Sequence, residues 1–127
     1  MKRIFIPLTI VALAALALAA PAVQAKGGKD GRIIALKASS AFPGAKGKAK
    51  FQNEGQRELE IEVEHVRRLA GKQVNFFVGA RKVGSKRISA LGAAQLDRRG
   101  SNFPAVKAGT RISVKTASGR LIVSGRF

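Results

Sequence analysis

Hydrophobic and polar residues alternate with a period of two along most of the chain after residue 30. The clearest example is residues 57–66, RELEIEVEHV, where Leu59, Ile61 and Val63 occupy every second position and glutamates stand between them. Residues two apart in a β-strand point to the same face, so this segment presents one apolar and one charged face. No long segment repeats its apolar residues at helical spacing. The pattern therefore predicts a domain built of strands.

Eight short segments show or approach this alternation, and Gly, Asn, Ser or Pro separates them. They are residues 31–38, 45–52, 57–66, 72–79, 82–89, 90–97, 109–116 and 119–127. The segment 90–97 is the weakest because it is rich in Ala. Seven or eight short strands joined by turn residues predict an all-β fold. We expect a small antiparallel β-sandwich or, alternatively, a partly open barrel.

The first 25 residues have a different pattern. A short positive start, MKR, precedes a continuous apolar run, and small residues at Val23 and Ala25 come just before Lys26. This arrangement predicts a secretory signal peptide that is cleaved after Ala25. An uncleaved membrane anchor is the alternative, because residues 4–23 are about long enough to span a bilayer. Cleavage places the mature protein in the periplasm or outside the cell.

The predicted mature chain runs from residue 26 to residue 127 and has 102 residues. We expect a flexible tail over residues 26–30 and one all-β domain over residues 31–127. The mature sequence holds no apolar stretch of membrane-spanning length and no Cys. Its stability is therefore expected to come from burial and hydrogen bonding, without disulfide bonds.

Five of the seven acidic residues lie within residues 46–64. A hairpin with a three-residue loop at residues 53–55, NEG, would bring the lysines of the first strand opposite the glutamates of the second. The expected pairs are Lys46 with Glu62, Lys48 with Glu60, and Lys50 with Glu58. The alternative is a slip of two residues that puts Lys50 opposite Glu60. In either case we expect a cross-strand charge ladder that specifies the register.

Charge is the strongest feature of the composition. The chain has 24 Lys and Arg against seven Asp and Glu, and loss of Lys2 and Arg3 with the signal peptide leaves 22, a formal charge of +15. Such a domain repels its own copies and attracts polyanions. Outside the cytoplasm these include lipopolysaccharide, wall polymers and extracellular DNA. The alternative is that the positive charge only keeps a small exported protein soluble.

The charge ladder would neutralise three lysines, so the excess positive charge is expected elsewhere. Four dibasic pairs stand near expected strand ends and loops. They are Arg67 and Arg68, Arg81 and Lys82, Lys86 and Arg87, and Arg98 and Arg99. Outward positions on the last two expected strands add Arg111, Lys115, Arg120 and Arg126. We expect the four dibasic pairs to contact phosphate or carboxylate groups of a polyanion directly.

Other site chemistry has little support in the sequence. His65 is the only histidine and falls in phase with Ile61 and Val63, so we expect a half-buried residue at a strand end and not a ligand or base. A row of glutamates along one strand does not converge as Ca²⁺ ligands must. The stretch GARKVGSK, residues 79–86, has Gly-Ser-Lys where a phosphate loop needs Gly-Lys-Ser/Thr. We expect no catalytic, metal or cofactor site.

Two functional hypotheses follow. The first is an exported, non-enzymatic β-sandwich binding module that associates with anionic envelope or extracellular polymers. The second is a structural or protein-interaction module of the bacterial envelope that binds another envelope protein and has no polyanion ligand. A dedicated single-strand nucleic-acid binder is less favoured, because the chain has no Trp or Tyr for base stacking.

Overall fold

The computed structural model describes residues 32–127 and places eight β-strands and one 3₁₀ helix there. The strands are β1 (Arg32–Ala38), β2 (Lys46–Glu54), β3 (Gln56–Glu64), β4 (Gln73–Val78), β5 (Arg81–Arg87), β6 (Ala94–Arg99), β7 (Arg111–Thr116) and β8 (Leu121–Arg126), and the 3₁₀ helix is η3 (Arg67–Leu69). The predicted all-β class is confirmed, and the number of strands is eight, the upper of the two predicted values. The predicted signal peptide, residues 1–25, and tail, residues 26–30, lie outside the described residues.

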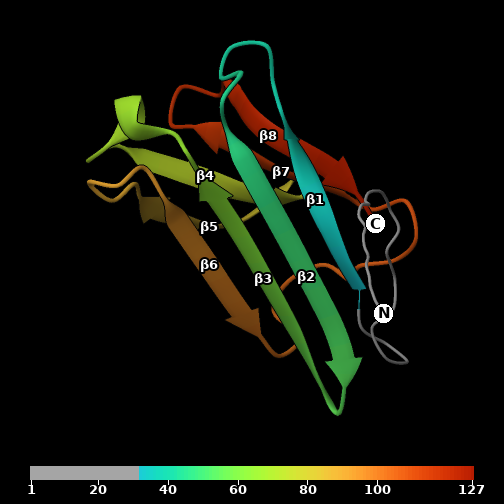
Figure 1. Cartoon of the computed structure of the whole chain (residues 1–127). Coiled ribbons are helices and arrows are strands. Elements are labelled where there is room, and N and C mark those ends of the chain that lie inside the picture. Colours follow the sequence, from blue (N-terminus) through green and yellow to red (C-terminus); the bar gives the residue numbers. More distant parts are fainter. Residues whose placement is uncertain (1–31) are drawn as a thin grey trace, which may run out of the picture.

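The eight strands form one antiparallel sheet in the order β5-β4-β7-β8-β1-β2-β3-β6. In Figure 1, strands β1, β2, β3 and β6 lie in front, and β4, β5, β7 and β8 lie behind them. Strand β1 joins the two halves, because it pairs with β2 and also, through Lys37–Ser124 and Ala38–Val123, with β8. The sheet is a nearly closed barrel, so the topology matches the partly open barrel better than two separate sheets.

The two ends of the sheet, β5 and β6, meet through side chains. The strand order does not make β5 and β6 hydrogen-bonded neighbours. A Cβ added at Gly84 of β5 would lie 2.7 Å from a terminal methyl of Leu96 on β6, so Leu96 packs directly against the glycine backbone. Leu96 is itself buried. Apolar packing therefore closes the barrel where the ladder of hydrogen bonds is interrupted.

The apolar face of each strand fills the interior of the barrel. The largest fully buried side chains include Phe76, Leu59, Ile61, Ile112 and Ile122. The ring of Phe51 on β2 packs edge to face with Phe103 and Phe127, at centroid distances of 6.5 and 6.4 Å. These contacts tie the long β6–β7 loop and the last residue of the chain to the core.

The β2–β3 hairpin forms, but its first predicted register is wrong by two residues. Lys50 lies opposite Glu60, which is the alternative register that the sequence left open. A slip of two keeps every side chain on its predicted face, so the charge pattern does not separate the two registers. The chain reverses at Gly55, whose φ is 78°, and not across a three-residue loop. Glycine adopts such a positive φ without steric cost, which permits the tighter turn.

The Ala-rich segment 90–97 contributes only its second half to β6. Before β6 the chain makes a tight turn, in which the Gly92 N–H donates to Ser89 O at 2.9 Å. The carbonyl of Gly92 in turn accepts a hydrogen bond of 3.0 Å from the Val66 N–H. The turn before β6 is thereby fastened to the residue that precedes η3.

The prediction of a half-buried His65 is wrong. Strand β3 ends at Glu64, and His65 is exposed and has a positive φ of 65°. This left-handed residue redirects the chain, so that Val66 and not His65 fills the next buried position. Periodicity could not anticipate the change because it assumes that the strand continues.

We expect His65→Val to lower the free energy of unfolding by about 1–2 kcal/mol, because a β-branched side chain is strongly disfavoured at positive φ. His65→Asn should be close to neutral, since Asn tolerates this conformation. Both substitutions remove the exposed contact of 3.6 Å between His65 Nε2 and Glu64 Oε1, so its loss cancels in the comparison. Urea denaturation followed by circular dichroism measures both. Equal denaturation midpoints for the two variants would contradict the assignment of a positive φ to residue 65.

Candidate functional site

Charge is divided unevenly around the barrel. Strands β2, β3 and β6 are neighbours in the sheet and together carry six acidic and six basic residues, a formal charge of zero. The acids are Glu54, Glu58, Glu60, Glu62, Glu64 and Asp97, and the bases are Lys46, Lys48, Lys50, Arg57, Arg98 and Arg99. These three strands are called the neutral strands below.

The rest of residues 32–127 holds fourteen Lys and Arg and no acidic residue. This acid-free region comprises η3, the loops and the contiguous strands β5, β4, β7, β8 and β1. Its basic residues are Arg32, Lys37, Arg67, Arg68, Lys72, Arg81, Lys82, Lys86, Arg87, Lys107, Arg111, Lys115, Arg120 and Arg126. The whole net charge of the described chain therefore lies in this region.

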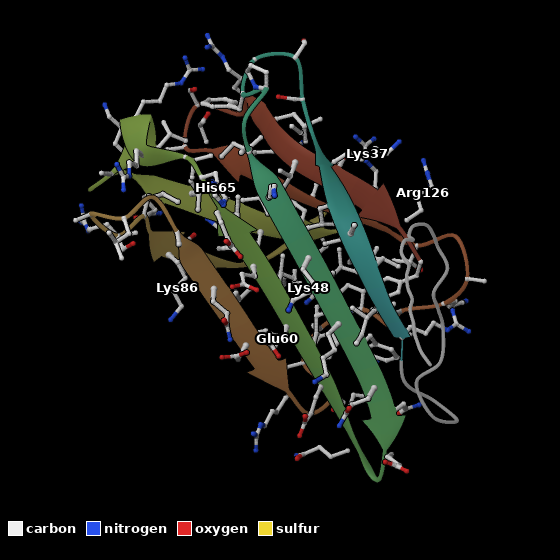
Figure 2. The ribbon with its side chains drawn as sticks, viewed as in Figure 1. Lys37, Lys48, Glu60, His65, Lys86 and Arg126 are labelled. Atoms are coloured by element: carbon white, nitrogen blue, oxygen red, sulfur yellow. The ribbon has the colours of Figure 1, made fainter. Side chains whose placement is uncertain are left out.

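The neutral strands satisfy their charges locally. Lys48 Nζ lies 3.7 Å from Glu62 Oε1, and Arg99 Nε lies 3.7 Å from Glu58 Oε2. Figure 2 shows Lys48 and Glu60 on the same outward face of the front strands. Exposed pairs of this kind contribute less than about 1 kcal/mol each to stability. In cross-strand register the three lysines and Arg99 lie opposite acids: Lys46 with Glu64, Lys48 with Glu62, Lys50 with Glu60, and Arg99 with Glu58.

The acid-free strands present basic and small polar side chains on their outward face, together with Phe77 and the exposed Ile33. One cross-strand row runs through Lys82, Phe77, Ser113, Ser124 and Lys37, on β5, β4, β7, β8 and β1 in turn. Ser113 is buried within this row, whereas Lys82 and Lys37 are exposed. Lys115 Nζ lies 4.9 Å from the centre of the Phe77 ring, a cation–π contact on the same face.

Two arginines oppose each other directly on this face. Arg111 of β7 pairs with Arg126 of β8, and both are exposed. Like charges in direct cross-strand register are destabilising. Within residues 32–127 neither guanidinium has an ion-pair partner, although Arg126 donates to Gly109 O at 3.0 Å. Figure 2 places Arg126 and Lys37 at the side of the barrel, away from the charge ladder. An external anion would relieve this repulsion.

An open groove of about 590 Å³ lies where three connecting segments of the acid-free region meet. Its walls come from the β1–β2 loop, from η3 with the start of β4, and from the β7–β8 turn. The lining residues are Phe42, Arg68, Leu69, Lys72, Gln73, Thr116, Ala117, Ser118 and Arg120. Three of these nine residues are basic and none is acidic. This site is called the cationic groove below.

Hydrogen bonds hold two walls of the groove in place. Ser39 Oγ, in the β1–β2 loop, donates to Leu121 O at 2.7 Å and so anchors that loop on β8. Thr116 closes the β7–β8 turn, because its N–H donates to Arg120 O at 2.8 Å and its Oγ1 accepts from the Arg120 N–H at 3.0 Å. These backbone positions are therefore set by the fold before any ligand binds, which lowers the entropic cost of binding.

Arg68 links η3 to the wall formed by the β1–β2 loop. Its Nη2 donates to Ala41 O, and the central carbon of its guanidinium lies 4.5 Å from the centre of the Phe42 ring. Phe42 is buried, with 6% exposure, so the arginine is seated on a fixed support. A guanidinium held in this way keeps a defined orientation at the groove wall.

A second, smaller pocket of about 210 Å³ lies on the neutral strands. Its lining residues are Lys50, Gln52, Glu58, Leu59, Glu60, Asp97, Arg98 and Arg99. Acidic and basic groups are equally numerous in it, so it does not select an ion of either sign.

The structure separates the eight residues of the dibasic prediction. Arg98 and Arg99 lie on β6, among the acids of the neutral strands. Arg67 and Arg68 form η3, while Arg81, Lys82, Lys86 and Arg87 lie along β5. The two ends of β5 are about 20 Å apart at 3.3 Å per residue. The eight residues therefore do not form one compact surface, and only Arg68 lines the cationic groove.

Arg87 lies close to the groove without lining it. Its Nη1 donates to Gly71 O at 2.6 Å, and it pairs with Gln73, which does line the groove. Lys86 faces the other way, and Figure 2 places it beside β6. The dibasic motif thus sends its two side chains to different parts of the surface, as alternation along a strand requires.

Sequence reasoning did not select Lys72, Gln73 or Ser118 as site residues. Lys72 stands alone in the sequence, and polar residues beside turns are common, so no local motif marks them. Arg120 was recognised as an outward residue but not as part of a groove. The shared signal is proximity to a turn, and only the folded barrel brings Lys72 and Arg120, which are 48 residues apart in the sequence, to the same site.

Two further observations concern only the described part of the chain. Residues 32–127 contain no group of three or more His, Cys, Asp or Glu positioned to hold a metal ion. The same residues include no helix that is long and apolar enough to cross a bilayer.

Comparison with known proteins adds no relative. The chain matches no protein-family model, no curated protein and no solved structure. The candidate function therefore depends on the charge distribution and the groove.

Proposed function

We propose that this protein is a non-enzymatic binding module that associates electrostatically with anionic polymers through its acid-free region. The predicted signal peptide adds that the polymers are those of the cell envelope or the extracellular space. Lipopolysaccharide, wall polymers and extracellular DNA all carry the required phosphate or carboxylate groups. Basic side chains bind such groups through charge-assisted hydrogen bonds.

The observation that carries this proposal is the division of charge. A solubilising role alone requires net charge but not its segregation. Here fourteen basic residues occupy five contiguous strands, η3 and loops without one acid, and three neighbouring strands are neutral. A continuous region of one sign concentrates counter-ions and attracts a polyanion along its whole length.

We expect retention of the mature protein on immobilised heparin or lipopolysaccharide to fall steeply as salt rises, because salt competes for the released counter-ions. The triple variant Lys37→Gln, Arg111→Gln and Arg126→Gln should elute at clearly lower salt than the parent. With a DNA probe, each lost phosphate contact should lower the slope of log K against log salt by about one.

The matched control removes the same charge from the neutral strands. Lys46→Gln, Lys48→Gln and Lys50→Gln also lowers the net charge by three but leaves the acid-free region intact. This control should elute close to the parent if location matters. Equal shifts for both triple variants would show that only total charge counts, and retention that ignores salt would remove the proposal.

A protein-interaction role is the second candidate, and the incomplete barrel favours it. Strands β5 and β6 each have a hydrogen-bonded neighbour on one side only. An exposed strand edge can accept a strand from a partner. The salt series distinguishes polyanion binding from binding of a protein partner. A protein partner that is captured in a fixed stoichiometry and stays bound at moderate salt would support binding at a strand edge.

A further inference from the structure

The cationic groove is larger than a simple anion requires. Its volume of about 590 Å³ is in the range of sites that take a small organic molecule, about 300–1,000 Å³. A lone phosphate or sulfate would fill only a small part of that space. The volume of the groove therefore suits an anionic group that is part of a larger molecule.

Three basic side chains reach the groove from three different places. Arg68 belongs to η3, Lys72 precedes β4, and Arg120 ends the β7–β8 turn. Within residues 32–127, none of the three has a carboxylate at ion-pair distance. These residues therefore place no negative charge beside the three cations to offset their mutual repulsion. All three cations would attract an anion that binds in the groove.

Arg68 has the geometry to make the most specific contact. A guanidinium carries five N–H donors in a planar fork that matches carboxylate, sulfate and phosphate. In Arg68 one nitrogen is used by Ala41 O and one face of the plane by the Phe42 ring. The side chain is therefore already oriented, and binding would order it little further.

The other lining residues indicate which kind of molecule could carry the anionic group. Gln73 and Ser118 supply neutral hydrogen-bonding groups, while Leu69 and Ala117 supply small apolar surfaces. A sugar ring carries both hydroxyls and C–H surface and suits this mixture. A nucleobase needs an open aromatic face for stacking. The Phe42 ring offers none, because it is 6% exposed and Arg68 lies over it.

We propose that the cationic groove binds one sugar unit bearing a carboxylate, sulfate or phosphate, as part of the anionic polymer of the function proposed above, on which this inference rests. Arg68 binds the anionic group through its planar fork, while Lys72 adds charge from the same wall and Arg120 adds charge from the β7–β8 turn. Gln73 and Ser118 bind hydroxyl groups of the same unit. The rest of the acid-free region then holds neighbouring units of the polymer without selecting their chemistry.

The test compares two triple variants in binding a short ligand. The ligand is a heparin-derived tetrasaccharide, which carries sulfate and carboxylate groups and is too short to span the whole acid-free region. Arg68→Gln, Lys72→Gln and Arg120→Gln should weaken its binding by more than about tenfold, since a hydrogen bond to a charged group is stronger than one between neutral groups. Lys37→Gln, Arg111→Gln and Arg126→Gln should weaken it by less than about threefold. Isothermal titration calorimetry at physiological salt measures both.

A conservative variant separates geometry from charge. Arg68→Lys keeps the charge but loses the planar fork and the stacking on Phe42. We expect it to weaken tetrasaccharide binding by about threefold or more, while its retention on long heparin stays near that of the parent. Circular dichroism and a thermal melt establish that each variant is folded before binding is measured.

Three outcomes would overturn this inference. The first is equal weakening by the two triple variants, which would mean that the groove is one part of a uniform charged surface. The second is equally tight, groove-dependent binding of a single-stranded oligonucleotide of the same charge. The third is competition by inorganic sulfate at the same charge concentration. If instead long heparin fails to bind at all, the polyanion-binding function itself is wrong.

Discussion

Phe76→Ala is expected to lower the free energy of unfolding by about 3–5 kcal/mol, which is a large share of the 5–15 kcal/mol typical of a whole domain. Phe76 is 0% exposed, and on β4 it lies between Val114 of β7 and Gly84 of β5. The neighbour at Gly84 has no side chain that could move to refill the space. The substitution therefore leaves a cavity in addition to losing buried apolar surface.

The adjacent phenylalanine supplies the matched control. Phe77 faces outward, is half-buried and contacts Lys115. We expect Phe77→Ala to cost about 1 kcal/mol or less. Urea denaturation followed by circular dichroism gives both values, provided that the slope with denaturant is unchanged. If the two variants lost similar stability, the assignment of inward and outward faces on β4 would be wrong.

Gly92→Ala is the second large effect, with an expected loss of about 2–5 kcal/mol from a strained positive φ and an overpacked contact together. Gly92 has a φ of 85°, and an added Cβ would lie 2.6 Å from the backbone nitrogen of Arg67 and 2.9 Å from its Cα. The clash is with backbone at the start of η3, which cannot move aside as a flexible side chain can.

Gly71→Ala separates the two causes of the expected loss, which are the positive φ and the clash with the Arg67 backbone. Its φ of 82° is nearly the same, but a Cβ added there meets nothing within 4 Å. Gly71→Ala should therefore cost only about 1–2 kcal/mol, the part due to the positive φ. Thermal and urea unfolding of both variants give the difference. Equal losses would show that the close approach of the Gly92 turn to η3 does not contribute.

The Gly92 variant also connects the fold with the candidate site. The Gly92 carbonyl accepts the Val66 N–H, and η3 with Arg68 follows directly. If Gly92→Ala remains folded at low temperature, we expect it to weaken tetrasaccharide binding, because η3 would be displaced from the Phe42 wall. Gly71 lies beyond the other end of η3, and Gly71→Ala creates no such clash. We therefore expect it to have a smaller effect on binding.

The fold was largely predictable from the sequence because strand formation is recorded locally. Alternation of Leu59, Ile61 and Val63 with glutamates defines a strand and both of its faces, and the same holds for β4 and β7. The failures occurred where alternation carries no information. A slip of two residues in the β2–β3 hairpin changes no face, and the left-handed His65 ends the strand although the predicted segment ran on to Val66.

The candidate site was much less predictable. Dibasic pairs are easily recognised in a sequence, but the alternation of side chains along a strand points Lys86 and Arg87 in different directions. In another pair, Arg99 Nε lies 3.7 Å from Glu58 Oε2 and so already has an acidic neighbour. The groove instead depends on single residues beside turns, among them Lys72 and Arg120. These residues lie far apart along the chain, and nothing in their local sequence distinguishes them from ordinary turn residues.

Residue type and a period of two are local features, and they were enough to predict the all-β class, seven or eight strands, the core-facing side of the regular strands and the excess of positive charge. The folded barrel was needed to place β6, with Asp97, beside the β2–β3 hairpin, which holds the other five acids of residues 32–127. It alone also brought Arg68, Lys72 and Arg120 to one groove. Both outcomes follow from the order in which the strands pair, and strand order arises from long-range packing that no local pattern encodes.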